Sequence, residues 1–61
     1  MNPADLDAAI SSNTFSLDML RAALKASGPV EAMVLMPLIQ KAAEIVNTLE
    51  QLKTALREVQ Q

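Results

Sequence analysis

The sequence lacks the residues that most very small proteins use for covalent or metal crosslinks. Its 61 residues include no cysteine and no histidine, so disulfides are excluded, and carboxylates alone are poor ligands for zinc. A chain of this length hides only about 60% of the surface that its unfolded state exposes. Because small domains generally need a disulfide, a metal or oligomerisation for stability, we expect association with itself or with a partner, and no metal.

Aromatic residues and glycine are almost as scarce. Phe15 is the one aromatic side chain and Gly28 the one glycine, which leaves little room for tight strand hairpins or glycine-rich phosphate loops. The remaining hydrophobic residues are alanine, leucine, valine, isoleucine and methionine, and hydrophobic residues make up 51% of the chain. Such residues fill helical seams. An all-α fold in a single small domain, residues 1–61, is therefore predicted.

The side chains that usually carry catalysis are missing as well. Without histidine, cysteine or tyrosine, the serine and threonine hydroxyls have no activating base nearby in the sequence. Asp5 and Asp7 are two residues apart and point to different faces of a helix, where they suit the positive end of its dipole. We expect no catalytic residue, no cofactor and no small-molecule substrate, and the protein is predicted not to be an enzyme.

Charge and hydropathy argue against two further classes of partner. The formal net charge is −2 and the five basic residues are scattered, whereas nucleic-acid binders generally carry a basic patch. No stretch approaches the roughly 18–20 apolar residues that span a bilayer. The first residues lack the basic segment and apolar core of a secretory signal, so a cytoplasmic location is expected.

Helix signals divide the chain into an arm, a turn and a long helix. Asn2 and Pro3 suit the cap and the first position of a helix, and Gly28-Pro29 is the clearest break. The arm is expected over residues 3–27, the turn at 28–29 and the long helix over 30–60. The polar string at 11–14 interrupts the arm, so the arm is either one helix with a soft middle or two helices with a restart at Ser16.

Apolar residues in both segments alternate at spacings of three and four, the heptad pattern of a coiled coil. In the long helix this seam comprises Leu38, Ala42, Ile45, Leu49, Leu52, Leu56 and Val59. The weaker seam of the arm comprises Leu6, Ile10, Asn13, Leu17, Leu20 and Leu24. The arm is therefore predicted to fold back at Gly28 as a helical hairpin. Asn13 is either a buried residue that fixes register or part of a solvated loop, and the loop is favoured.

Residues 31–40, EAMVLMPLIQ, contain eight uncharged apolar residues in a row. Pro37 removes a helical hydrogen bond and clashes with the carbonyl of Met33, so either a kink or a restart of the helix is expected, and the kink is favoured. Because the apolar side chains surround the axis here, one returning arm can cover only part of them. The remaining residues are predicted to form an oligomer or partner interface: Val30, Met33, Val34, Met36, Ile39 and Val46.

These features favour a protein–protein interaction module that self-associates into a helical bundle as a homodimer or higher oligomer, or that binds a helical partner. Its role would be that of a small assembly subunit, an adaptor, or a chaperone-like or inhibitory protein. The principal alternative is an amphipathic helical protein on a membrane surface. The absence of tryptophan and the acidic, amide-rich polar face count against that alternative.

Overall fold

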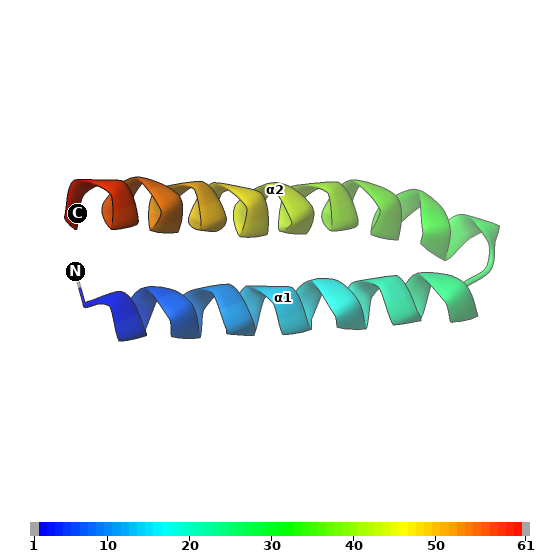
Figure 1. The fold of residues 1–61 in the computed structure, drawn as a ribbon. Coiled ribbons are helices and arrows are strands. Elements are labelled where there is room, and N and C mark those ends of the chain that lie inside the picture. Colours follow the sequence, from blue (N-terminus) through cyan, green and yellow to red (C-terminus); the bar gives the residue numbers. More distant parts are fainter. Residues whose placement is uncertain (1, 61) are drawn as a thin grey trace.

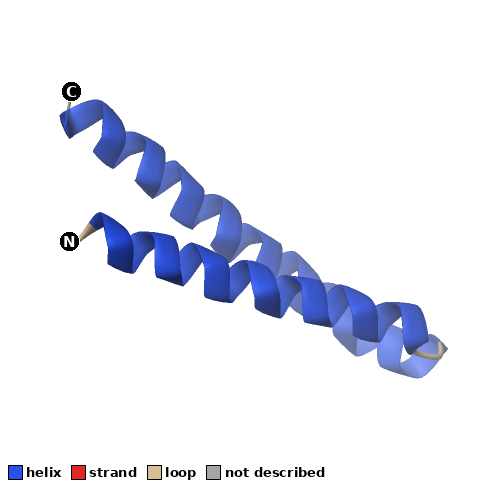
Figure 2. Ribbon diagram, turned by 60° about the horizontal axis from the view of Figure 1, so that its bottom comes forward, coloured by secondary structure: helices blue, strands red, loops and turns tan. Residues whose placement is uncertain are grey.

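A computed structural model describes residues 2–60, which form a hairpin of two antiparallel helices (Figure 1). Helix α1 spans Pro3–Ala26 and helix α2 spans Pro29–Gln60. The predicted all-α hairpin is confirmed, and its arm is a single helix. The hairpin measures 48 × 15 × 13 Å. Its radius of gyration is 14.4 Å, against about 10.5 Å for a compact chain of this length. Figure 2 shows the two helices inclined to each other rather than strictly parallel.

Helix α1 has an N-terminal cap at Asn2, and it continues through the polar residues 11–14, where the sequence predicts an interruption. The side-chain oxygen of Asn2 accepts a hydrogen bond from the backbone N–H of Ala4 at 3.0 Å, and Pro3 follows in the first turn. Asn13 is partly buried, and its side-chain amide donates to the carbonyl of Ala9 at 2.7 Å. The favoured loop at residues 11–14 is therefore wrong, because packing of the apolar row on both sides of Asn13 overrides the weak helix propensity of these residues.

The turn between the helices depends on Ser27 and Pro29 more than on glycine flexibility. Ser27 has extended backbone angles, φ −89° and ψ 156°, and both its N–H and its hydroxyl donate to the carbonyl of Leu24, at 3.1 and 2.8 Å. The carbonyl of Gly28 accepts the first bond of α2, from the N–H of Ala32. Gly28 does not have a positive φ. A Cβ there would lie 3.0 Å from a carboxylate oxygen of Glu31, which is the nearest atom that it would meet.

Helix α2 runs through Pro37 without a break. The restart that the sequence left open is therefore not observed. Proline has no N–H, so the carbonyl of Met33 lacks its usual helical donor. Met33 lies on the exposed surface, where water can bond this carbonyl in place of the missing N–H.

Most of the buried and partly buried positions of each helix follow a heptad spacing, and these rows pack between the helices. In α1 the row matches the predicted one and comprises Leu6, Ile10, Asn13, Leu17, Leu20 and Leu24. The row continues to Ser27, the residue that follows the end of the helix. In α2, the row defined here as the inner row comprises Ala32, Leu35, Ile39, Ala42, Val46, Leu49, Lys53 and Leu56. Among the described residues only Leu6 and Leu17 are buried, with 4% and 6% of their surface exposed.

The inner row differs from the seam predicted for the long helix. Ala42, Leu49 and Leu56 belong to both. Four predicted seam residues are instead exposed on the surface: Leu38, Ile45, Leu52 and Val59. The places of the first three are taken by the residues one position further along, Ile39, Val46 and Lys53, although the sequence predicts Ile39 and Val46 in an outside interface. The predicted seam is uninterrupted in the sequence, whereas the inner row contains Lys53, which is partly buried in the structure. A lysine can occupy such a position because its charged end reaches the rim.

Candidate interaction surface

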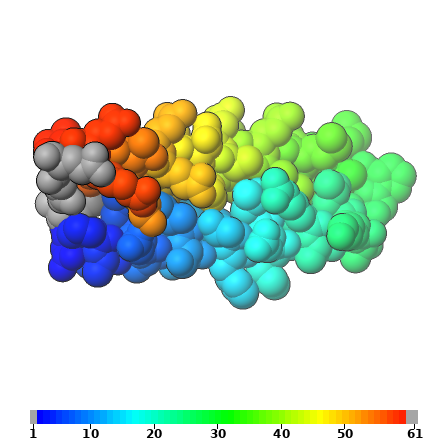
Figure 3. All heavy atoms as spheres, in the orientation of Figure 1, coloured from blue at the N-terminus to red at the C-terminus, as the bar shows by residue number. Residues whose placement is uncertain are grey.

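The exposed residues of α2 form a second heptad row beside the inner one. This outer row comprises Val34, Leu38, Lys41, Ile45, Thr48, Leu52, Ala55 and Val59, all exposed. At about 100° per residue, it lies roughly a quarter turn around α2 from the inner row. Since the inner row faces α1, the outer row faces one broad side of the hairpin. In the space-filling view the helices lie side by side along their length, so that a broad side is two helices wide (Figure 3).

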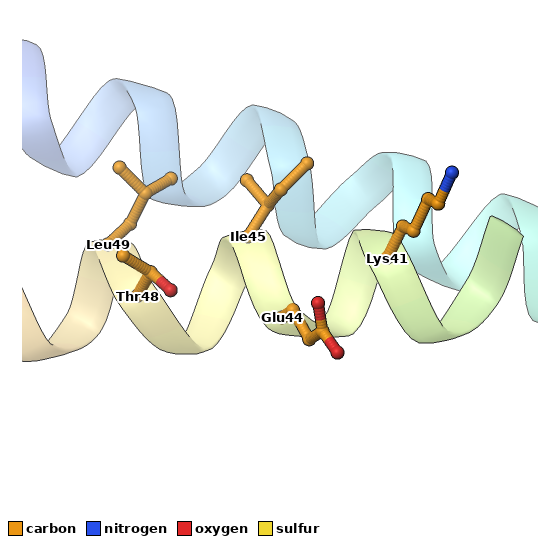
Figure 4. A pocket seen from close by; sticks show the side chains of 5 residues that line it. All are labelled: Lys41, Glu44, Ile45, Thr48 and Leu49. Atoms are coloured by element: carbon orange, nitrogen blue, oxygen red, sulfur yellow. The ribbon is translucent and has the colours of Figure 1, made fainter. Parts of the chain in front are cut away.

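A shallow groove lies on the outer row near the middle of α2 (Figure 4). Its lining residues are Lys41, Glu44, Ile45, Thr48 and Leu49. The first four have the spacing i, i+3, i+4, i+7, which is the set of four residues that forms a hole for one side chain of a neighbouring helix in coiled-coil packing. In Figure 4, Ile45 and Leu49 are directed toward the side on which α1 lies, and Glu44 and Thr48 lie across the front of α2. Residues with this spacing are neighbours on one face of a helix, so the groove lies between successive turns of α2.

Helix α1 contributes small side chains to the same broad side. Its row at the corresponding positions contains Ala9, Ser12, Ser16, Met19 and Ala23. Met19 is the one large side chain of the five, and 57% of its surface is exposed. Small residues allow the backbone of another helix to approach closely, and Met19 is the one large side chain in this row that a second layer of helices would have to accommodate.

The opposite broad side of the hairpin is charged. Near its open end, Asp7 and Arg57 line a small hollow together with Lys53, whose ammonium bonds the Asp7 carboxylate at 2.8 Å. Along α1 the charged residues at equivalent positions are Asp7, Asp18, Arg21 and Lys25. On the apolar side, Lys41 is the one charged residue of the outer row, and Asp5 and Glu31 lie near its two ends. The two broad sides therefore differ in character along most of the hairpin, and Met33 and Met36, near the turn, are exposed apolar residues at positions of the charged side.

A further exposed apolar cluster lies at the start of α2, next to the turn. Val30, Met33, Val34 and Met36 have between 55% and 76% of their surface exposed. All four belong to the interface predicted from the sequence, and that role stays a prediction. Ile39 and Val46, the other two residues of that interface, are partly buried in the inner row. The structure thus separates the six predicted interface residues into an exposed cluster and an intramolecular pair.

The total surface shows how much of the hairpin is left uncovered. Its accessible area is 4695 Å², whereas a compact folded chain of 6.6 kDa exposes about 3,900 Å². The excess of roughly 800 Å² equals the area that each partner buries in a protein–protein interface of standard size. Ten large hydrophobic side chains of the described chain are exposed. This amount of apolar surface is typical of a protein whose interface is open.

Other kinds of site have less support in the described residues. Within residues 2–60, no helix has both the length and the apolar content needed to cross a bilayer. The same part of the chain has no group of three acidic residues placed to hold a metal ion. No family model matches the chain, and no curated protein or solved structure is significantly similar to it.

Proposed function

We propose that the protein is a non-enzymatic protein–protein interaction module, a helical hairpin that associates with another copy of itself into a helical bundle. It would serve as a small assembly subunit, an adaptor, or a chaperone-like or inhibitory protein. The observation that carries this proposal is the outer row, because it has the heptad spacing of a packed seam and yet is exposed along its whole length. Helices in bundles bury such rows against a neighbouring helix.

The energetics point in the same direction. Removing apolar surface from water contributes roughly 25 cal/mol per Å², and two buried leucines in the described chain give a hairpin of this length little stability of its own. Covering the outer row with a second hairpin would bury further apolar surface without any new fold. Assembly and folding are therefore coupled, and helicity should increase with protein concentration.

Sedimentation equilibrium at micromolar concentration tests the proposal directly. We expect a dimer or a larger oligomer, together with a helical circular dichroism spectrum that weakens on dilution. A well-folded monomer whose helicity does not change with concentration would overturn the proposal. Measuring the spectrum and the mass on the same samples separates a stable monomer from an unfolded one.

The cluster of Val30, Met33, Val34 and Met36 supports a second candidate, association with a membrane surface. These residues form an exposed apolar tip, and Lys25 lies in the last turn of α1 beside it. Flotation with vesicles of neutral lipid, with and without anionic lipid, tests this candidate. Binding that Met33→Asp abolishes would favour it, and recovery of all the protein in the lipid-free fraction would exclude it.

A further inference from the structure

The position of the outer row determines how a second copy can cover it. Two hairpins that stack broad side to broad side are related by a twofold axis in the plane between them. If the axis runs across the helices, α2 packs antiparallel on α2 of the other copy. If the axis runs along the helices, α2 packs instead on α1 of the other copy. The two arrangements place different residues in contact.

The side chains of the outer row are complementary in size to those of a second copy of the row that runs in the opposite direction. Antiparallel neighbours in coiled-coil packing pair residues at equal distances from the axis, and the midpoint of this row lies between Val46 and Asn47. The resulting pairs are Ile45 with Thr48, Lys41 with Leu52, Leu38 with Ala55, and Val34 with Val59. In the first three, a large aliphatic side chain meets a small one or the flexible stem of lysine. Such pairs fill space without forcing two bulky residues together.

The row on α1 gives nearly the same axis. Its central residues, Ala9, Ser12, Ser16 and Met19, are symmetric about Thr14. The ion pair between Asp7 and Lys53 places these two residues at the same level of the hairpin. Thr14 lies seven residues after Asp7 in α1, and Val46 lies seven residues before Lys53 in α2, so Thr14 and Val46 are also at the same level. One twofold axis therefore serves both helices to within about a residue.

We infer that a second copy of this chain docks on the apolar broad side with α2 antiparallel to α2, about an axis near Val46. This inference rests on the proposed self-association and specifies its geometry. The side chain at position 48 enters the groove beside Ile45 of the other copy, and the reverse contact forms at the same time. The area available agrees, since a side of 48 × 15 Å is roughly 700 Å² and a standard interface takes about 800 Å² from each partner.

Site-directed crosslinking tests this geometry, and the chain has no natural cysteine to interfere. In Thr48→Cys, the two thiols of a dimer lie close to the axis and to each other. Asn47→Cys is the matched control, because residue 47 is exposed at almost the same level but projects toward the charged side. With a short bis-maleimide, we expect at least about tenfold more crosslinked dimer from Thr48→Cys, because the control thiols are separated by two helix diameters of ~10 Å.

Sedimentation of the same two variants distinguishes the possible failures. If both variants are dimers and Thr48→Cys crosslinks no better than Asn47→Cys, the antiparallel arrangement is wrong and self-association stands. If both variants are folded monomers, the proposed function fails together with the geometry. The arrangement is supported if Thr48→Cys crosslinks more than Asn47→Cys, and if this yield stays constant on dilution over the concentration range in which the protein remains a dimer.

Discussion

Helix α2 carries two heptad rows of similar apolar character, and only one of them is covered. The inner row packs against α1, whereas the outer row is exposed from Val34 to Val59. Each row contains one lysine, Lys53 in the covered row and Lys41 in the exposed row, and Lys53 holds its ammonium at the rim beside Asp7. The outer row also contains Thr48, so the covered row is slightly the more apolar of the two. The comparison teaches that a two-helix hairpin can pack one heptad row inside itself and still leave a second row of nearly the same apolar character exposed.

The largest effect is expected from a charge placed in the inner row. Val46→Asp puts a carboxylate against α1 and should lower the free energy of unfolding by about 3 kcal/mol, with loss of helicity at all accessible concentrations. Thermal unfolding followed by circular dichroism measures this change. The control is Asn47→Asp at the neighbouring exposed position, where a change within about 0.5 kcal/mol is expected. Equal melting temperatures for the two variants would show that position 46 is not packed.

A smaller effect, of a different kind, is expected from the same charge in the outer row. Ile45→Asp should raise the dissociation constant of the dimer at least about tenfold, or ~1.4 kcal/mol, because two carboxylates then meet near the axis. At high protein concentration its helicity should approach that of the unmodified chain. Sedimentation equilibrium measures the constant, and Gln51→Asp, exposed on the outward side of α2, is the control. An unchanged constant for Ile45→Asp would remove the outer row from the interface.

The smallest effect concerns the ion pair at the rim of the inner row. The side chains of Lys53 and Asp7 are 42% and 56% exposed, so water and salt screen their attraction. Asp7→Asn should lower the free energy of unfolding by less than about 1 kcal/mol, and the difference should shrink at high salt. Denaturation at low and high salt concentration measures it. A loss of several kcal/mol, unaffected by salt, would mean that this pair determines the register of the helices.

The sequence predicts the hairpin and one of its two packed rows correctly. The row of α1 is apolar on one narrow stripe, so Leu6, Leu17 and their neighbours have one possible direction to pack. The apolar arc of α2 is wide enough for two overlapping rows, which share Ala42, Leu49 and Leu56. The row through Leu52 is predicted because its apolar residues alternate at spacings of three and four without interruption, whereas the row that packs contains Lys53. Only the three-dimensional structure shows that Lys53 is partly buried while its ammonium bonds the carboxylate of Asp7 on α1.

The same overlap explains the mixed placement of the predicted interface. Val30, Met33, Val34 and Met36 precede the part of α2 where the two rows compete, and they are exposed as expected for surface residues. Ile39 and Val46 belong to the inner row but not to the seam predicted from the sequence, so their placement depended on which of these two rows α1 covers. The groove beside Ile45 depends on the conformations of several side chains together, and no periodicity in the sequence indicates it.

The Ser27-Gly28 connection brings the beginning of α1 and the end of α2 to the same end of the molecule (Figure 1). Anything joined to either end of the hairpin therefore leaves from one pole, and the apolar tip around Met33 forms the other. In the antiparallel assembly the two poles alternate, so labels attached to the two copies near Pro3 would be separated by about the 48 Å length of the hairpin. With the axis along the helices instead, the same labels would lie at one end of the dimer, so a single distance distinguishes the two arrangements.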